Sequence, residues 1–237
     1  MAAPNRRFKF QHLTCAAVNP PRFMLPPILC YVTDRNSLAA PAGPARHTAL
    51  IERIAGAAAA GVDWIQVREK DLEARQLFDL ASTATAAMRG SAAKLLVNDR
   101  LDVAWATGAA GVHLGENSLP IADVVQEKRR SGPENFLVGA SCHSPDAAVR
   151  AAHEGANYVF FGPVFATPSK AAFGEPQGLA RLAEVCWGVS IPVLAIGGIT
   201  AENAAACLEA GATGIAGIRL FQEAPDLGAL LGKIRSM

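Results

Sequence analysis

One short phrase recurs four times in this chain: GVDWIQV at 61–67, GAAGVHL at 108–114, GANYVFF at 155–161 and GATGIAGI at 211–218. Each copy opens with a glycine and continues, within two or three residues, into an apolar run. A glycine just past a helix adopts the left-handed conformation that ends the helix. A continuous apolar run of this length is typical of a strand that is buried on both faces. The phrase therefore predicts repeated helix-to-strand units, which build a parallel sheet.

The whole chain contains eight candidate strands, with Ala-rich segments of helical spacing between most of them. The expected strands are Ile28–Thr33, Trp64–Val67, Lys94–Val97, Gly111–Leu114, Leu137–Ala140, Tyr158–Phe161, Pro192–Ile196 and Gly214–Ile218. The expected helices include Thr48–Ala60, Glu73–Met88, one capped by Ser144, one capped by Thr200, and a last one from Pro225 to Ile234. Eight strands alternating with helices predict an α/β fold, a single (β/α)8 TIM barrel. An open doubly wound sheet is the alternative, but it usually carries an early Gly-rich phosphate loop, which does not follow 28–33.

Length and composition agree with one barrel and argue against several other classes of protein. The chain has 237 residues, and such barrels typically have about 250. Its net charge of +1 gives no electrostatic case for binding nucleic acid or an anionic membrane. No apolar run approaches the ~20 residues of a membrane span. The five cysteines are an odd number and form no C-x-x-C pair, which favours a reduced, cytoplasmic compartment. We therefore expect small-molecule partners, and the sequence leaves open whether the protein is a homo-oligomer.

The first 23 residues differ from the rest. They mix basic residues with an Asn-Pro-Pro step at 19–21 and show neither periodicity nor the apolar core of a secretory signal. We expect residues 1–23 to be a disordered extension and residues 24–237 to be the barrel domain. Met24, directly before the first strand, is a candidate for the true start.

Polar side chains follow the second expected strand, where α/β folds keep their chemistry. Strand alternation places Gln66, Arg68 and Lys70 on one face. An amide, a guanidinium and an ammonium group in one cluster suit an anionic ligand. The alternative is a solvated strand end with a surface ion pair between Glu69 and Lys70.

The next three strands also end in polar residues. Asp99, after the third strand, is suited either to Mg²⁺ or to capping the following helix. A single histidine such as His113, within the fourth strand, is more often structural than catalytic. His143, after the fifth strand, is placed to act as an acid or base, or equally to fill space as a hydrogen-bonded group.

The last three strands carry features expected of a phosphate site. The segment from Gly162 to about Pro176 is longer than the usual 2–6 residues of a βα loop, and its hydroxyl groups and lysine suggest a lid that grips phosphate. Gly197-Gly198 and the residues after the eighth strand stand where backbone N–H groups of this fold usually bind phosphate. A plain turn is the alternative for the double glycine.

These motifs, in this order, resemble one known family. The chain is similar to the thiamine phosphate synthase / thiazole tautomerase (TenI-like) superfamily over roughly Leu29 to Ile234. The motifs are Gln66-x-Arg68-Glu69-Lys70, Asn98-Asp99, Gly111-Val112-His113, Ser141-x-His143, the 162–170 loop and Ala195-Ile196-Gly197-Gly198-Ile199. The resemblance implies a synthase that joins hydroxymethylpyrimidine pyrophosphate to thiazole phosphate. This reaction releases pyrophosphate, uses Mg²⁺ and passes through a pyrimidine carbocation.

The resemblance also implies roles for individual residues. The pyrimidine pyrophosphate would be held by Gln66, Arg68, Lys70 and Asn98, and the Mg²⁺ ion by Asp99. The pyrophosphate would be contacted by Ser141 and Lys170, and the thiazole phosphate by Thr167, Ser169 and Gly198, with Gly197, Ile218 and Arg219 at the same end of the barrel. These placements suit the chemistry, because expelling pyrophosphate requires cations where negative charge accumulates.

Two positions depart from the synthase pattern. Ser118 stands where the pattern has an aspartate, the second metal ligand, and Arg219 stands where it usually has serine. Glu116 is a candidate replacement for the lost carboxylate. The tautomerase branch is the alternative: it uses no metal and has a histidine at the place of His143 as acid/base. The intact 66–70 cluster favours the synthase. A barrel that binds thiamine precursors without turnover is a third interpretation.

Overall fold

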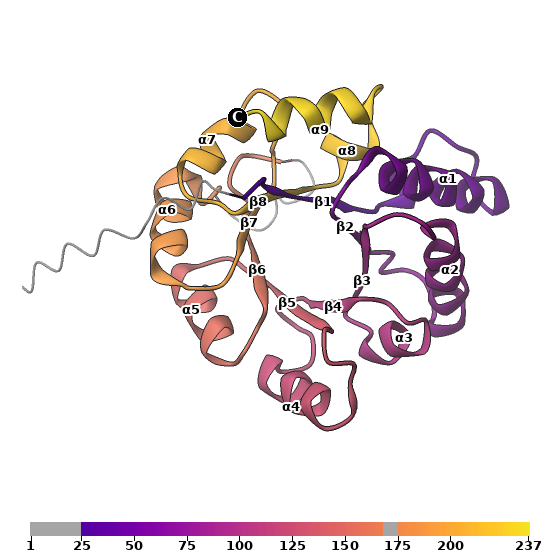
Figure 1. The fold of residues 1–237 in the computed structure, drawn as a ribbon, viewed down its shortest axis with the longest axis horizontal. Coiled ribbons are helices and arrows are strands. Elements are labelled where there is room, and N and C mark those ends of the chain that lie inside the picture. The colour runs from indigo at the N-terminus through magenta and orange to yellow at the C-terminus, as the bar shows by residue number, and fades with distance from the viewer. Residues whose placement is uncertain (1–24, 168–174) are drawn as a thin grey trace, which may run out of the picture.

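The structure is a computed structural model that describes residues 25–167 and 175–237. Within these residues, parallel strands close into a barrel in the order β1 to β8, surrounded by helices (Figure 1). The strands are β1 (Ile28–Val32), β2 (Trp64–Val67), β3 (Lys94–Asn98), β4 (Gly111–Leu114), β5 (Leu137–Cys142), β6 (Tyr158–Phe161), β7 (Val193–Ile196) and β8 (Gly214–Gly217). The predicted (β/α)8 barrel is therefore confirmed, and the open-sheet alternative is wrong.

The helices alternate with the strands along the chain. They are the 3-10 turn η1 (Arg35–Ser37), α1 (Pro44–Ala60), α2 (Ala74–Ala87), α3 (Leu101–Ala106), α4 (Ile121–Ser131), α5 (Pro145–His153), α6 (Gly178–Gly188), α7 (Ala204–Glu209), α8 (Arg219–Gln222) and α9 (Leu227–Arg235). Every described helix is too short or too polar to cross a membrane.

The recurring phrase has the expected local structure. The opening glycines of its four copies all have positive φ angles: 94° at Gly61, 66° at Gly108, 94° at Gly155 and 99° at Gly211. Ser144 caps α5 as predicted, because its hydroxyl group accepts a hydrogen bond from Ala147 N at 3.2 Å.

Several predicted boundaries need correction. The first long helix begins at Pro44 rather than Thr48, and β5 continues past Ala140 to Cys142. Two further corrections lie near the carboxyl end of the barrel. Thr200 does not cap α7, which begins only at Ala204. The Asn203 side chain accepts from Thr200 N at 2.8 Å and donates to Gly198 O at 3.0 Å, so it organises a turn before the helix. The short helix α8 was not predicted, and Ile218 is its N-cap rather than a strand residue.

The core has two layers. A large outer cluster lies between the strands and the helices. A smaller inner cluster fills the barrel itself, and its members are Cys30, Val32, Trp64, Leu96, Tyr158, Phe160, Leu194 and Ala216. The barrel interior is therefore packed, and the polar groups lie above it, at the carboxyl ends of the strands. The predicted extension at 1–23 lies outside the described residues.

Candidate active site

A row of hydrogen-bonded side chains crosses the carboxyl ends of β2, β3 and β4. Gln66 Nε2 donates to Asn98 Oδ1 at 2.9 Å, and Asn98 Nδ2 donates to Asp99 Oδ2 at 2.7 Å. Asp99 Oδ1 in turn accepts from Gly115 N at 3.0 Å and from the Ser118 hydroxyl group. The structure thus brings together the residues that the sequence selected after three separate strands.

Asp99 is held in an unusual backbone conformation. Its φ angle is +62°, a region that side chains other than glycine seldom occupy, and its N–H donates to His113 O at 2.9 Å. The N-cap of α3 is Arg100, with no side-chain capping bond. The interpretation of Asp99 as a helix cap is therefore wrong, because its carboxylate reaches across to the β4–α4 loop instead.

The loop after β4 does not supply a second carboxylate to this group. Ser118 is the residue in contact with Asp99, whereas the neighbouring Glu116 is exposed. No group of three or more His, Cys, Asp or Glu side chains suited to a metal ion occurs among the residues described. Whether the protein binds Mg²⁺ stays a prediction.

The cluster after β2 differs from the sequence expectation. The strand ends at Val67, so Lys70 lies in an exposed turn, while Gln66 is buried and Arg68 is half-buried. The alternative, a surface pair between Glu69 and Lys70, is wrong, because Glu69 is only 5% exposed.

Glu69 is bound to the segment that follows β1. Thr33 Oγ1 donates to Glu69 Oε1 at 2.6 Å, and Arg35 Nη1 lies 2.9 Å from Oε2. Burial raises the pKa of Glu69, although Thr33 and Arg35 act in the opposite direction. Thr33 Oγ1 also accepts from Arg68 N at 3.0 Å, which fixes the backbone that carries the Arg68 side chain.

The residues after β1 were missed in the sequence analysis. Arg35 also forms two hydrogen bonds with Asp71, both of 2.7 Å, and so ties the β1–α1 loop to the β2–α2 loop. Thr33-Asp34-Arg35 follows a buried strand just as the selected motifs do, so the same criterion would have found it.

Two histidines were left with open roles. His113 is buried and contacts both Tyr158 Oη, at 3.1 Å from Nδ1, and Ser141 Oγ, at 2.9 Å from Nε2. The structural interpretation of His113 is thus supported. His143 Nδ1 forms a hydrogen bond with the carbonyl oxygen of Gly162, which links β5 to the loop after β6.

The double glycine after β7 is required by a close approach of two loops. Gly198 has a φ angle of +66°, and a Cβ atom there would lie 2.5 Å from Ala166 O. Phe165 N donates to Gly197 O at 3.0 Å, so the loop after β6 runs alongside this turn. Thr167 is half-buried at the end of that described stretch, whereas Ser169 and Lys170 lie outside the described residues.

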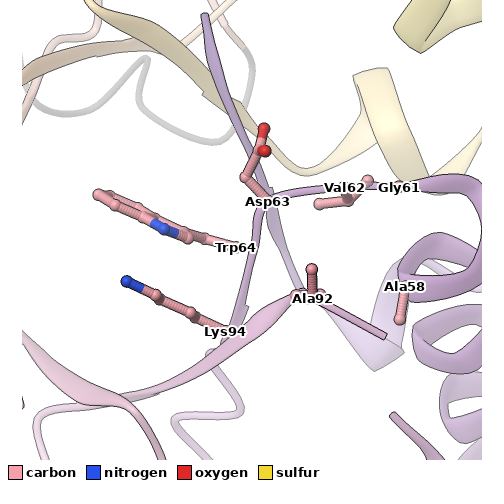
Figure 2. Close-up of a pocket in the computed structure, with 8 residues that line it drawn as sticks. Ala58, Gly61, Val62, Asp63, Trp64, Ala92 and Lys94 are labelled. Atoms are coloured by element: carbon pink, nitrogen blue, oxygen red, sulfur yellow. The ribbon is translucent and has the colours of Figure 1, made fainter. Parts of the chain in front are cut away.

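A separate cavity of about 190 Å³ lies at the opposite, amino-terminal end of the barrel. Figure 2 shows the Trp64 and Lys94 side chains extending from it in the same direction, from the starts of β2 and β3. Its one described carboxylate, Asp63, is bound by Arg235 at 3.1 Å and by Leu29 N at 2.8 Å. In this fold the amino-terminal end serves stability and the carboxyl end carries catalysis, so we do not assign the active site here.

A closed (β/α)8 barrel with polar side chains gathered at the carboxyl ends of its strands defines the class of TIM-barrel enzymes. A family model described as thiamine monophosphate synthase matches residues 29–221. The chain belongs to this thiamine monophosphate synthase family.

Similar proteins support this assignment. A protein of Methanoculleus marisnigri named thiamine-phosphate synthase is 49% identical, over 76% of this chain and 83% of its own. A putative thiamine-phosphate synthase of Geobacter sulfurreducens is 45% identical, over 84% and 88%. The solved structure of thiamine phosphate pyrophosphorylase from Pyrococcus furiosus is 33% identical, has a TM-score of 0.73 and covers 88% of this chain and 94% of its own. The resemblance seen in the sequence is confirmed, and with it the expectation of a transferase in thiamine biosynthesis.

Proposed function

We propose that the protein is a thiamine phosphate synthase that joins hydroxymethylpyrimidine pyrophosphate to thiazole phosphate and releases pyrophosphate. Family membership carries the reaction class. One structural observation supports the location of the active site: the hydrogen-bonded row from Gln66 through Asn98 and Asp99 to Ser118. This row places an amide pair and a carboxylate at the barrel mouth, where enzymes of this fold bind their substrates.

The pyrimidine pyrophosphate is assigned to the β2 and β3 side of the mouth. Gln66 and Asn98 offer amide groups that recognise a polar ring, and their mutual hydrogen bond holds both in place. Arg68 and Lys70 supply positive charge for the diphosphate, with Arg68 suited to bidentate contact and Lys70 acting as a mobile point charge.

The residues present fit a weak Mg²⁺ site. Asp99 Oδ2 accepts one hydrogen bond, from Asn98, and so has a further lone pair available, while Ser118 Oγ is adjacent to Oδ1. Mg²⁺ is commonly held by one or two carboxylates together with substrate phosphates and waters. Asp99, with Ser118, would therefore hold the ion once the substrate supplies further oxygens. The ion would supply positive charge where the leaving pyrophosphate becomes more negative.

The thiazole phosphate is assigned to the β6, β7 and β8 side. The backbone N–H groups of the turn at Gly197 and Gly198 are assigned to the phosphate, because this position usually binds phosphate in this fold. Thr167 and Arg219 would add a hydroxyl group and a positive charge at this end, and Ile218 would line it. Ser169 lies outside the described residues, and its contact with the phosphate stays a prediction. Ser141 and Lys170 are assigned to the pyrophosphate, which they would stabilise as it leaves.

The test is synthesis from both substrates with and without Mg²⁺, followed by thiochrome fluorescence. We expect Mg²⁺-dependent synthesis, abolished by Asp99→Ala. The matched control is Asp102→Ala, which removes an exposed aspartate paired with Arg100 on the adjacent helix. Equal activity of the two variants would contradict the assignment of Asp99.

The replacement of the second metal carboxylate by Ser118 favours one other candidate, a thiazole tautomerase without metal. In that enzyme His143 would move the proton. Turnover of a thiazole carboxylate phosphate in EDTA, with Asp99→Ala harmless and His143→Ala inactive, would replace the synthase proposal. The cytoplasmic location and a homo-oligomeric state remain predictions.

A further inference from the structure

Three side chains form a hydrogen-bonded chain that leads from the barrel interior to its mouth. Tyr158 on β6 contacts His113 Nδ1 on β4 at 3.1 Å, and His113 Nε2 contacts Ser141 Oγ on β5 at 2.9 Å. Tyr158 is fully buried, His113 is 1% exposed and Ser141 is half-buried. The chain therefore links a group in the core to a group within reach of a ligand.

This arrangement is possible because residue 139, between the two rings, is a glycine. His113 and Tyr158 both pair in register with Gly139, on the strand between them. A Cβ atom at Gly139 would lie 2.0 Å from Tyr158 Cζ and 2.4 Å from its hydroxyl oxygen. The phenol group thus crosses over Gly139 to reach the histidine.

Aromatic contacts hold the histidine ring in place. Its centroid lies 4.1 Å from the ring of Phe160 and 5.5 Å from the ring of Tyr158. The Trp64 ring lies 4.7 Å from that of Tyr158. The rings of His113 and Tyr158 therefore cannot move apart without displacing other large rings.

Burial of the phenol decides which nitrogen of His113 carries the proton. Within the described residues, the acceptor in reach of the Tyr158 hydroxyl group is His113 Nδ1. If Nδ1 carried the proton instead, the buried phenol hydrogen would have no acceptor among the described residues, and leaving a buried donor unpaired is unfavourable. A charged imidazole would leave the same hydrogen unsatisfied and would also bury a charge.

We propose that Tyr158 is a positioning residue for Ser141. It donates to Nδ1, so His113 carries its proton on Nε2 and donates to Ser141 Oγ. The Ser141 hydrogen is then directed toward the mouth, where it donates to a diphosphate oxygen of the substrate. The identity of that anion rests on the proposed function, whereas the tautomer of His113 does not.

The tautomer can be measured directly by NMR on uniformly ¹⁵N-labelled full-length protein. Long-range ¹H–¹⁵N spectra distinguish a protonated ring nitrogen from an unprotonated one, and loss of the signals in His113→Gln assigns them. We expect Nε2 to be protonated and Nδ1 unprotonated in the wild type at neutral pH. Tyr158→Phe should shift His113 toward a mixture of tautomers. Tyr31→Phe is the matched control, because Tyr31 is a buried phenol bonded to Gln222 Oε1 at 2.7 Å, and it should leave the His113 signals unchanged.

A kinetic cycle tests the consequence for Ser141. Ser141→Ala should lower kcat/KM by roughly 10- to 100-fold, the usual effect of losing one hydrogen bond to a charged group. Tyr158→Phe should lower it by about three- to tenfold, and the double variant should equal Ser141→Ala alone. Losses that multiply in the double variant would show a general structural effect and overturn the proposal.

The NMR and kinetic experiments distinguish failure of the positioning role from failure of the proposed function. A wild-type His113 protonated on Nδ1 overturns the positioning role even in an active synthase. Absence of synthesis in the wild type contradicts the proposed function, while the NMR result still decides the tautomer.

Discussion

Replacing Ser118 by aspartate tests whether residues 99 and 118 together form a metal site. The Ser118 hydroxyl group now donates to Asp99 Oδ1. Ser118→Asp removes that donor and places a second carboxylate against the first. The change should destabilise the protein without metal and strengthen Mg²⁺ binding.

The size of the effect follows from the contact. Two unit charges 4 Å apart repel by about 1 kcal/mol in water and about 4 kcal/mol at the effective dielectric constant of a protein surface. Both residues are half-buried, so we expect an intermediate loss of about 2–3 kcal/mol in EDTA. For a protein of this size that corresponds to a fall in Tm of roughly 5–10 °C.

Thermal denaturation in EDTA and in millimolar Mg²⁺ measures this directly. Ser118→Asp should recover most of its lost Tm in Mg²⁺, and synthesis should reach half its maximal rate at a lower Mg²⁺ concentration than in the wild type. Ser118→Asn is the control, since it has the same shape without the charge. If the Tm of Ser118→Asp responds to Mg²⁺ no more than that of Ser118→Asn, these two positions do not form a metal site.

Three further predictions concern the rest of the site. Gly139→Ala should lower the free energy of unfolding by about 1–3 kcal/mol through overpacking against Tyr158, as measured by urea denaturation; an unchanged midpoint would mean that the ring has room to move. Burial raises the pKa of Glu69 above its ordinary 4.5, so the folded state binds this proton more tightly than the unfolded state. The stability of the wild type relative to Glu69→Gln should therefore rise as the pH falls from 7 toward 4.5; a difference that is flat in pH would contradict the shift. Lys170→Ala should reduce turnover at least tenfold with little change in Tm, and unaltered turnover would remove Lys170 from the site.

The architecture was predictable because it depends on local signals. Glycines at helix ends and short apolar runs identify the strands, and their alternation with Ala-rich helices leaves few topologies other than the barrel. Missed elements such as α8, with four residues from Arg219 to Gln222, and the 3-10 turn η1, with three, are too short for a periodic pattern to show.

The candidate site was predictable only in part. Polar residues after strands are visible in the sequence, so Gln66, Asn98 and Asp99 could be selected. Contacts between distant segments could not be selected in the same way. Glu69 is bound by Arg35, 34 positions earlier, whereas the alternative considered from the sequence was a surface pair with Lys70. For the same reason, the sequence could not show that the Asp99 carboxylate binds the β4–α4 loop instead of capping the next helix.

The aromatic layer beneath the mouth of the barrel determines the route by which substrates enter and products leave. Trp64, Tyr158 and Phe160 fill the barrel below the site, so no ligand can pass from one end of the barrel to the other. Both reactants must therefore arrive, and both products must depart, through the same carboxyl-end opening. The packing beneath the site thus limits access to a single opening, in addition to what the residues that line the site determine.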